Sequence, residues 1–183
     1  MSTSRVRDIV LGGLFVALAL VLPVFFHAFG LGAALLPMHI PVFLAGFFVS
    51  PWAAAVIGMV SPMLSATLTG MPPLSPPIAQ AMTFELGVYG LVTSLAYRAT
   101  GRVLVSWAVA AVSGRLASGI AGAVILPLFG FTGVPFLYPL SAGVVAGLPG
   151  LALQAVLVPG IIYLVNRVLP QATTPARAGG RPR

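Results

Sequence analysis

Long apolar segments and short breaks alternate along almost the whole chain, and the breaks are rich in Gly, Pro or Arg. The six apolar segments cover residues 9–26, 37–49, 52–69, 78–97, 103–126 and 142–165. A helix that crosses a bilayer needs about 20 mostly apolar residues, and most of the segments are close to that length. The second segment is shorter and contains Pro37 and Pro41, so we expect an irregular span there. The pattern predicts an all-α integral membrane protein, a compact bundle of six transmembrane helices.

The composition supports a membrane protein. Of the 183 residues, 59% are hydrophobic and 6% are charged, whereas about a quarter of the residues are charged in a typical soluble protein. The mean hydropathy is +1.10. We therefore expect a single transmembrane domain over residues 1–168. Residues 169–183 are polar and basic, which predicts a disordered cytoplasmic tail.

The basic residues flank the apolar segments. Two arginines precede the first segment and two more lie at the break over residues 98–102. The others at or beyond the last segment are Arg167, Arg177, Arg181 and Arg183. The positive-inside rule places such flanks in the cytoplasm, and an even number of spans between them returns the chain to the same side. Both termini are therefore expected to be cytoplasmic, and the net charge of +7 gives no reason to expect nucleic-acid binding. The outer connections would be residues 27–36, 70–77 and 127–141.

Several kinds of chemistry lack their residues. The chain has no Lys and no Cys, two His and two acidic residues. Without Lys there is no P-loop to bind nucleotide phosphates, and without Cys there is no thiolate nucleophile or ligand. So few ligating side chains also argue against a metal site built by the protein. We expect no catalytic residues, no metal and no cofactor.

Two ionisable residues, Glu85 and Arg115, lie within predicted spans, where such residues are costly and usually functional. Helical spacing places Tyr89 on the face of Glu85, and Ser118 on the face of Arg115. The last segment adds a row of small and polar residues at helical spacing: Gly143, Gly147, Gly150 and Gln154. If these three faces meet, they form a polar crevice that opens outward.

Alternative interpretations of these residues stay open. Glu85 and Arg115 either neutralise each other as a structural pair or hold a solute. His39 lies between two prolines, so it either donates to free backbone carbonyls or contacts a ligand. The run MPPLSPP, residues 71–77, is either a stiff connection or a preformed rim. Gly13 and Ala17 form a small-xxx-small pair, which allows close approach of another helix, either of this chain or of another protein.

The chain contains four characteristic runs: LPMHIPVFLAGFFVSP (36–51), SPMLSATLTGMPPL (61–74), FELGVYGLVTSLAYR (84–98) and AGLPGLALQAVLVP (146–159). With them it resembles the substrate-binding S components of energy-coupling factor (ECF) vitamin transporters. The resemblance implies six helices in a prokaryotic plasma membrane, with a vitamin pocket near the outer face that the outer loops gate. It also implies docking of the first helix onto a transmembrane coupling subunit driven by two ATPases. The family's usual Ala-xxx-Ala docking pair appears here as Gly13-xxx-Ala17.

We expect the substrate to be bound by the polar residues of the crevice and by His39: Glu85, Tyr89, Arg115, Ser118, Gln154 and His39. Arg115 favours an anionic ligand, and its neighbours can serve hydroxyl or amide groups. A small carboxylated vitamin with hydroxyls, such as pantothenate, fits best, and riboflavin, a pyridoxine-like compound and niacin remain alternatives. Biotin is disfavoured because the glycine-rich signature of biotin-type members is absent. Thiamine is disfavoured because Trp52 and Trp107 lie near predicted cytoplasmic ends.

Two other functional classes are alternatives to a binding subunit. An autonomous secondary transporter normally shows internal repeats, and the six segments are dissimilar. An intramembrane serine protease needs a GxSx context, which Ser113 lacks, and His39 lies in a different segment. The sequence therefore favours a transport subunit whose partners are a small vitamin, the coupling and ATPase subunits, and the lipid bilayer.

Overall fold

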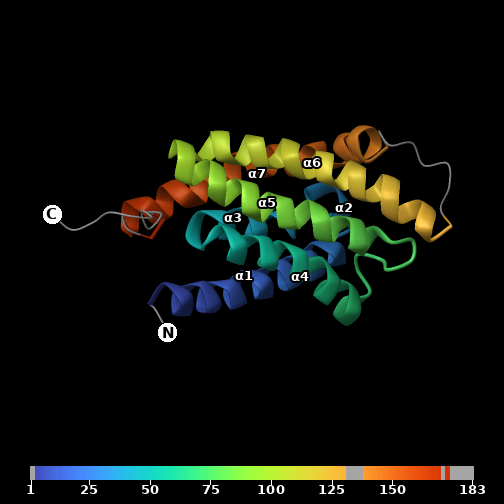
Figure 1. Ribbon diagram of the computed structural model, residues 1–183, viewed down its shortest axis with the longest axis horizontal. Coiled ribbons are helices and arrows are strands. Elements are labelled where there is room, and N and C mark those ends of the chain that lie inside the picture. Colours follow the sequence, from blue (N-terminus) through green and yellow to red (C-terminus); the bar gives the residue numbers. More distant parts are fainter. Residues whose placement is uncertain (1–2, 131–137, 170–171, 174–183) are drawn as a thin grey trace.

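The computed structural model describes residues 3–130, 138–169 and 172–173, and all regular structure within them is helical (Figure 1). The five long helices are α1 (Thr3–Ala28), α4 (Pro51–Thr69), α5 (Ile78–Thr100), α6 (Val103–Leu128) and α7 (Tyr138–Val168). The two short helices are α2 (Gly32–Leu35) and α3 (His39–Phe48). The long helices run along the long axis of the molecule, and α5 packs between α4 and α6. The fold is thus an all-α bundle, as the sequence predicts.

Local signals set several helix ends. The side chain of Ser50 accepts a hydrogen bond from the backbone of Ala53 at the start of α4, and Pro51 occupies the first helical position. Both are preferred there, because a side-chain oxygen satisfies a free N–H and Pro has none to lose. At the other end, α4 stops at Gly70 with φ +74°, and α5 stops at Gly101 with φ +65°. Glycine adopts this left-handed conformation without the steric penalty of a side chain.

The short helix α3 lies at the centre of the bundle and contacts α1, α4, α5 and α7. Residues His39 to Phe47 are all buried. Ten residues of helix span about 15 Å, roughly half of the hydrocarbon core. The second predicted segment is therefore a short central helix rather than a full-length span. Its apolar character on all sides follows from its burial.

The helices α4 and α5 touch through their backbones at two glycines. A Cβ atom on Gly58 would lie 2.0 Å from the carbonyl oxygen of Leu86, and one on Gly90 would lie 2.2 Å from that of Ala54. Neither position admits a side chain without moving one helix. The small residues thus fix the position of α5, the helix that carries Glu85.

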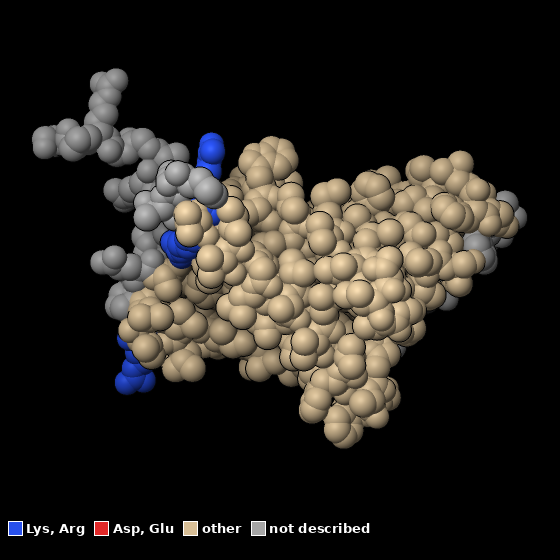
Figure 2. Space-filling model, turned by 90° about the horizontal axis from the view of Figure 1, so that it is seen from below, with Lys and Arg blue, Asp and Glu red and all other residues tan. Residues whose placement is uncertain are grey.

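The basic flanks lie together at one end of the molecule. The start of α1, the turn between α5 and α6, and the end of α7 share this end (Figure 1). There the guanidinium of Arg7 donates to the carbonyl of Ala172, and that of Arg98 donates to the carbonyl of Val49 at 3.5 Å. Figure 2 shows the basic side chains of one face at the same end, with no acidic side chain in view. An even number of spans between the basic flanks requires such a common end, because it returns the chain to the same side of the membrane.

Four helices of the described residues are long and apolar enough to cross a membrane: α1, α4, α6 and α7. The remaining two predicted spans correspond to α3, which has ten residues, and to α5, which has 23 residues but is less apolar. Part of the third outer connection, residues 131–137, lies outside the described residues. So does most of the predicted tail, residues 170–171 and 174–183.

Candidate functional site

A polar cluster inside the bundle is centred on the carboxylate of Glu85 in α5. Its Oε1 atom lies 3.0 Å from Nη1 of Arg115 in α6 and accepts a 2.8 Å hydrogen bond from the hydroxyl of Tyr89. The Nε2 atom of His39, at the start of α3, lies 3.6 Å from the same oxygen, slightly too far for a hydrogen bond. The structure thus brings together four of the six predicted substrate-binding residues.

Neighbouring aromatic and small residues hold Tyr89 in place. Tyr89 follows Glu85 by one helical turn, so the two side chains lie on one face of α5. Its ring centroid lies 4.6 Å from that of Phe43 and 5.4 Å from that of His39. A Cβ atom on Gly114 would lie 2.2 Å from the Tyr89 ring, so only glycine leaves room for it there. No pattern in the sequence points to Phe43 and Gly114, because their roles depend on how α3 and α6 pack against α5.

The cluster is almost fully buried. The side chains of His39 and Glu85 are 3% and 4% exposed, and that of Arg115 is 12% exposed. A single charge buried in this way is costly unless an opposite charge neutralises it. In the structure Glu85 and Arg115 form such a neutralising ion pair. This geometry is that of the structural pair, one of the two alternatives that the sequence leaves open.

Several buried polar atoms of the predicted site residues have no hydrogen-bond partner among the described residues. They are Nε and Nη2 of Arg115, both ring nitrogens of His39, and both side-chain amide atoms of Gln154. Buried polar groups are normally satisfied, since an unpaired donor or acceptor loses its hydration without compensation. The interior thus retains free donors and acceptors beyond those that the fold uses.

Two predicted residues are not joined to the cluster. Ser118 is buried on α6, three residues after Arg115, and Gln154 is fully buried on α7. Within the described residues, no hydrogen bond or ion pair links either side chain to the carboxylate of Glu85. The surroundings of Gly143, the first residue of the predicted α7 row, lie outside what the structure describes.

The predicted outward-opening crevice is covered in the structure. The backbone of the segment 34–36 rests on α7, where a Cβ atom on Gly150 would lie 2.8 Å from the carbonyl oxygen of Ala34. A Cβ atom on Gly147 would lie 2.9 Å from Cδ1 of Leu36. The expectation that these glycines line an open crevice is therefore wrong, because the end of α2 and the following residue, Leu36, pack directly against them.

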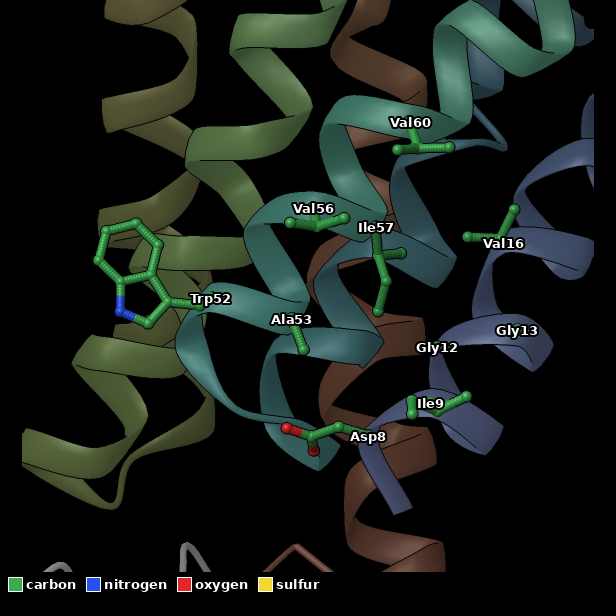
Figure 3. Close-up of a pocket in the computed structure, with 10 residues that line it drawn as sticks. All are labelled: Asp8, Ile9, Gly12, Gly13, Val16, Trp52, Ala53, Val56, Ile57 and Val60. Atoms are coloured by element: carbon green, nitrogen blue, oxygen red, sulfur yellow. The ribbon is translucent and has the colours of Figure 1, made fainter. Parts of the chain in front are cut away.

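A second concave surface lies between α1 and α4, near the end of the molecule that carries the basic flanks (Figure 3). This groove has a volume of about 400 Å³, and its lining is apolar apart from Asp8. Gly13 contributes bare backbone to it, and a Cβ atom there would meet nothing within 4 Å. Ala17, one turn further along α1, is also exposed. Both residues of the predicted docking pair are therefore accessible from outside the bundle.

Residues 7–162 match the profile of the family described as "ECF transporter, substrate-specific component". Neither a curated protein nor a solved structure matches the chain. Because the matched region includes most of the chain, the protein belongs to this family. It is a multi-pass membrane protein and a substrate-specific transport subunit, and not an enzyme.

Proposed function

We propose that this ECF substrate-specific component binds a small vitamin in the plasma membrane of a prokaryote and delivers it to an ATP-driven importer. The observation that carries this proposal is the buried polar cluster of α3, α5 and α6 within a chain of this family. In the proposed topology the chain crosses the bilayer six times, with the short α3 as the helical part of the second crossing, and both termini are cytoplasmic. The short α3, whose residues His39 to Phe47 are buried, is then shielded from lipid by the helices around it.

The ligand site in this proposal is the cluster of Glu85, Tyr89, Arg115 and His39, with Ser118 and Gln154 as further contacts. Arg115 favours an anionic ligand, while the hydroxyl, amide and imidazole groups suit a ligand with hydroxyl or amide groups. Pantothenate has this combination and is the preferred ligand. Riboflavin, a pyridoxine-like compound and niacin are the alternatives that the test below includes.

Energy for uptake comes from partner subunits in this proposal, because the chain has no Lys and no P-loop. A transmembrane coupling subunit would dock on α1 at Gly13 and Ala17, and two ATPases would drive it. The exposure of both residues supports this arrangement, since small residues allow a second helix to approach closely.

Two measurements test the proposal. Native mass spectrometry of the detergent-purified protein should detect a co-purified vitamin from the set above. Vesicles that contain the chain together with the coupling and ATPase subunits should take up that vitamin when ATP is present. Uptake by the chain alone at the same rate would contradict the proposal and favour a secondary transporter.

The docking step has its own matched pair of variants. Gly13→Leu should abolish uptake without changing vitamin affinity, because the new side chain projects outward from α1 and away from the polar cluster. Gly160→Leu on α7 is the control, since a Cβ atom there also meets nothing within 4 Å. If Gly13→Leu supports uptake as well as Gly160→Leu does, α1 is not the docking helix.

A further inference from the structure

We infer that the ligand carries a carboxylate, and that the Nε and Nη2 atoms of Arg115 bind it side-on next to Gly147. This inference rests on the proposed function, because it concerns the same ligand site. It goes further by assigning one chemical group of the ligand to one edge of one side chain. It also makes Gly147 a residue that determines specificity.

The geometry of the guanidinium supports the assignment. The pair with Glu85 uses Nη1, at 3.0 Å from Oε1. Within the part of the chain that the structure describes, Nε and Nη2 have no hydrogen-bond partner, and together they form a second edge of the planar group. Their N–H bonds point in parallel, and this is the spacing that the two oxygens of a carboxylate match. The free edge is thus a bidentate receptor for a planar, two-oxygen anion.

The position of Gly147 shows where the anion would lie. A Cβ atom on Gly147 would be 3.3 Å from Nη2 of Arg115, so α7 passes close to the free edge without a side chain in the way. The same Cβ position is 2.9 Å from Cδ1 of Leu36. The end of the Leu36 side chain therefore lies beside this edge, and Nε and Nη2 are sealed from solvent. Binding of a carboxylate there requires this flexible side chain to move aside.

The charge of the cluster is compatible with a singly charged ligand. Glu85 already neutralises Arg115, so a ligand carboxylate adds one negative charge to a buried site. A doubly charged phosphate would add two negative charges to the same space, at a higher desolvation cost. A monocarboxylate is therefore the class of anion that this site favours.

The test compares ligands that differ only in the proposed group. Pantothenate and panthenol differ by a carboxylate and an alcohol, and nicotinate and nicotinamide differ by a carboxylate and an amide. Equilibrium affinities are measured for both pairs, and for riboflavin and pyridoxine, with the full-length protein in detergent. We expect one of the two acids to bind at least tenfold more tightly than its neutral counterpart.

Two variants then locate the carboxylate. Arg115→Lys keeps a positive charge for Glu85 but removes the parallel donors, so the affinity for the acid should fall about 10- to 100-fold. The affinity for the neutral counterpart should change little. Gly147→Ala should weaken binding of the acid in the same selective way, because the new methyl group occupies space beside Nη2. Gly160→Ala, on the same helix with nothing within 4 Å, is the matched control and should bind normally.

The possible failures can be told apart. If the protein binds riboflavin or pyridoxine but neither acid, the carboxylate assignment is overturned while the proposed function stands. Equal binding of the acid by Arg115→Lys and by the unaltered protein overturns the assignment to the Nε and Nη2 edge. Absence of any bound vitamin, together with absence of uptake in the presence of the partner subunits, overturns both proposals. Thermal unfolding of each variant shows whether a loss of binding reflects a loss of folded protein.

Discussion

The buried pair of Glu85 and Arg115 can be removed one charge at a time or as a whole. At 3.0 Å and an effective dielectric constant of about 20, the attraction between the two charges is about 5.5 kcal/mol. Arg115→Met leaves the carboxylate with the Tyr89 hydroxyl as its hydrogen-bond donor in a nearly closed interior. Removing one partner of a buried pair typically destabilises a protein by about 3–5 kcal/mol.

The double variant, Arg115→Met with Glu85→Gln, should recover most of this loss. Replacing both charges with neutral groups of similar size is often close to neutral for stability. The Tyr89 hydroxyl can also donate to the oxygen of an amide in place of the carboxylate. For a chain of this size, a loss of about 3 kcal/mol corresponds to a decrease in Tm of about 6–12 °C. Thermal unfolding in detergent therefore separates the single variants from the double variant.

The affinity for pantothenate gives the second readout. If Arg115 contacts the ligand, the double variant regains stability but binds pantothenate more weakly by about 2–5 kcal/mol, because a buried charge pair with the ligand is lost. A neutral analogue such as panthenol should lose much less. Full recovery of pantothenate binding in the double variant would show that Arg115 is not a ligand contact. An unchanged Tm in Arg115→Met would refute the premise that the pair stabilises the fold.

Two further predictions concern the bundle and its orientation. Gly58→Ala should lower the free energy of unfolding by about 1–3 kcal/mol, because the added Cβ lies 2.0 Å from the backbone oxygen of Leu86. Gly160→Ala, where a Cβ meets nothing within 4 Å, should leave it unchanged. Thermal unfolding of both variants checks this, and equal Tm values would contradict the close contact. The chain has no native Cys, so cysteines introduced at the exposed positions Ser75 and Thr100 report topology directly. An impermeant thiol reagent should label Ser75→Cys in intact cells and Thr100→Cys only after permeabilisation, and the reverse pattern would overturn the proposed orientation.

The positions of the long helices could be predicted from the sequence because their signals are local. The predicted segment at 52–69 corresponds to α4 within one residue, since Ser50 and Pro51 mark its start and Gly70 its end. The first segment lies inside α1, which is longer at both ends. The apolar segment marks only the residues that avoid water. A helix can continue beyond it through polar residues such as Arg5, so α1 is longer than the segment.

The covered state of the cluster could not be predicted in the same way. Glycines at helical spacing on α7 have the same pattern whether they line an open crevice or admit another part of the chain. The structure shows the second case for Gly147 and Gly150, because the segment from Ala34 to Leu36 rests on them. This contact joins residues more than 100 positions apart, and no periodicity within one helix encodes it. The same reason applies to Gly114, whose role depends on the Tyr89 ring of a different helix.

The sequence presents the structural pair and the ligand-binding arginine as alternatives, but the chemistry of the guanidinium makes them compatible. Arginine has five N–H donors in one plane, and Glu85 is paired with Nη1 in this structure. This contact leaves Nε and Nη2 without a hydrogen-bond partner among the described residues. A lysine in this position has a compact charge and could not divide its donors between two edges. A residue that neutralises Glu85 for folding can thus keep a second edge of the same side chain for a ligand.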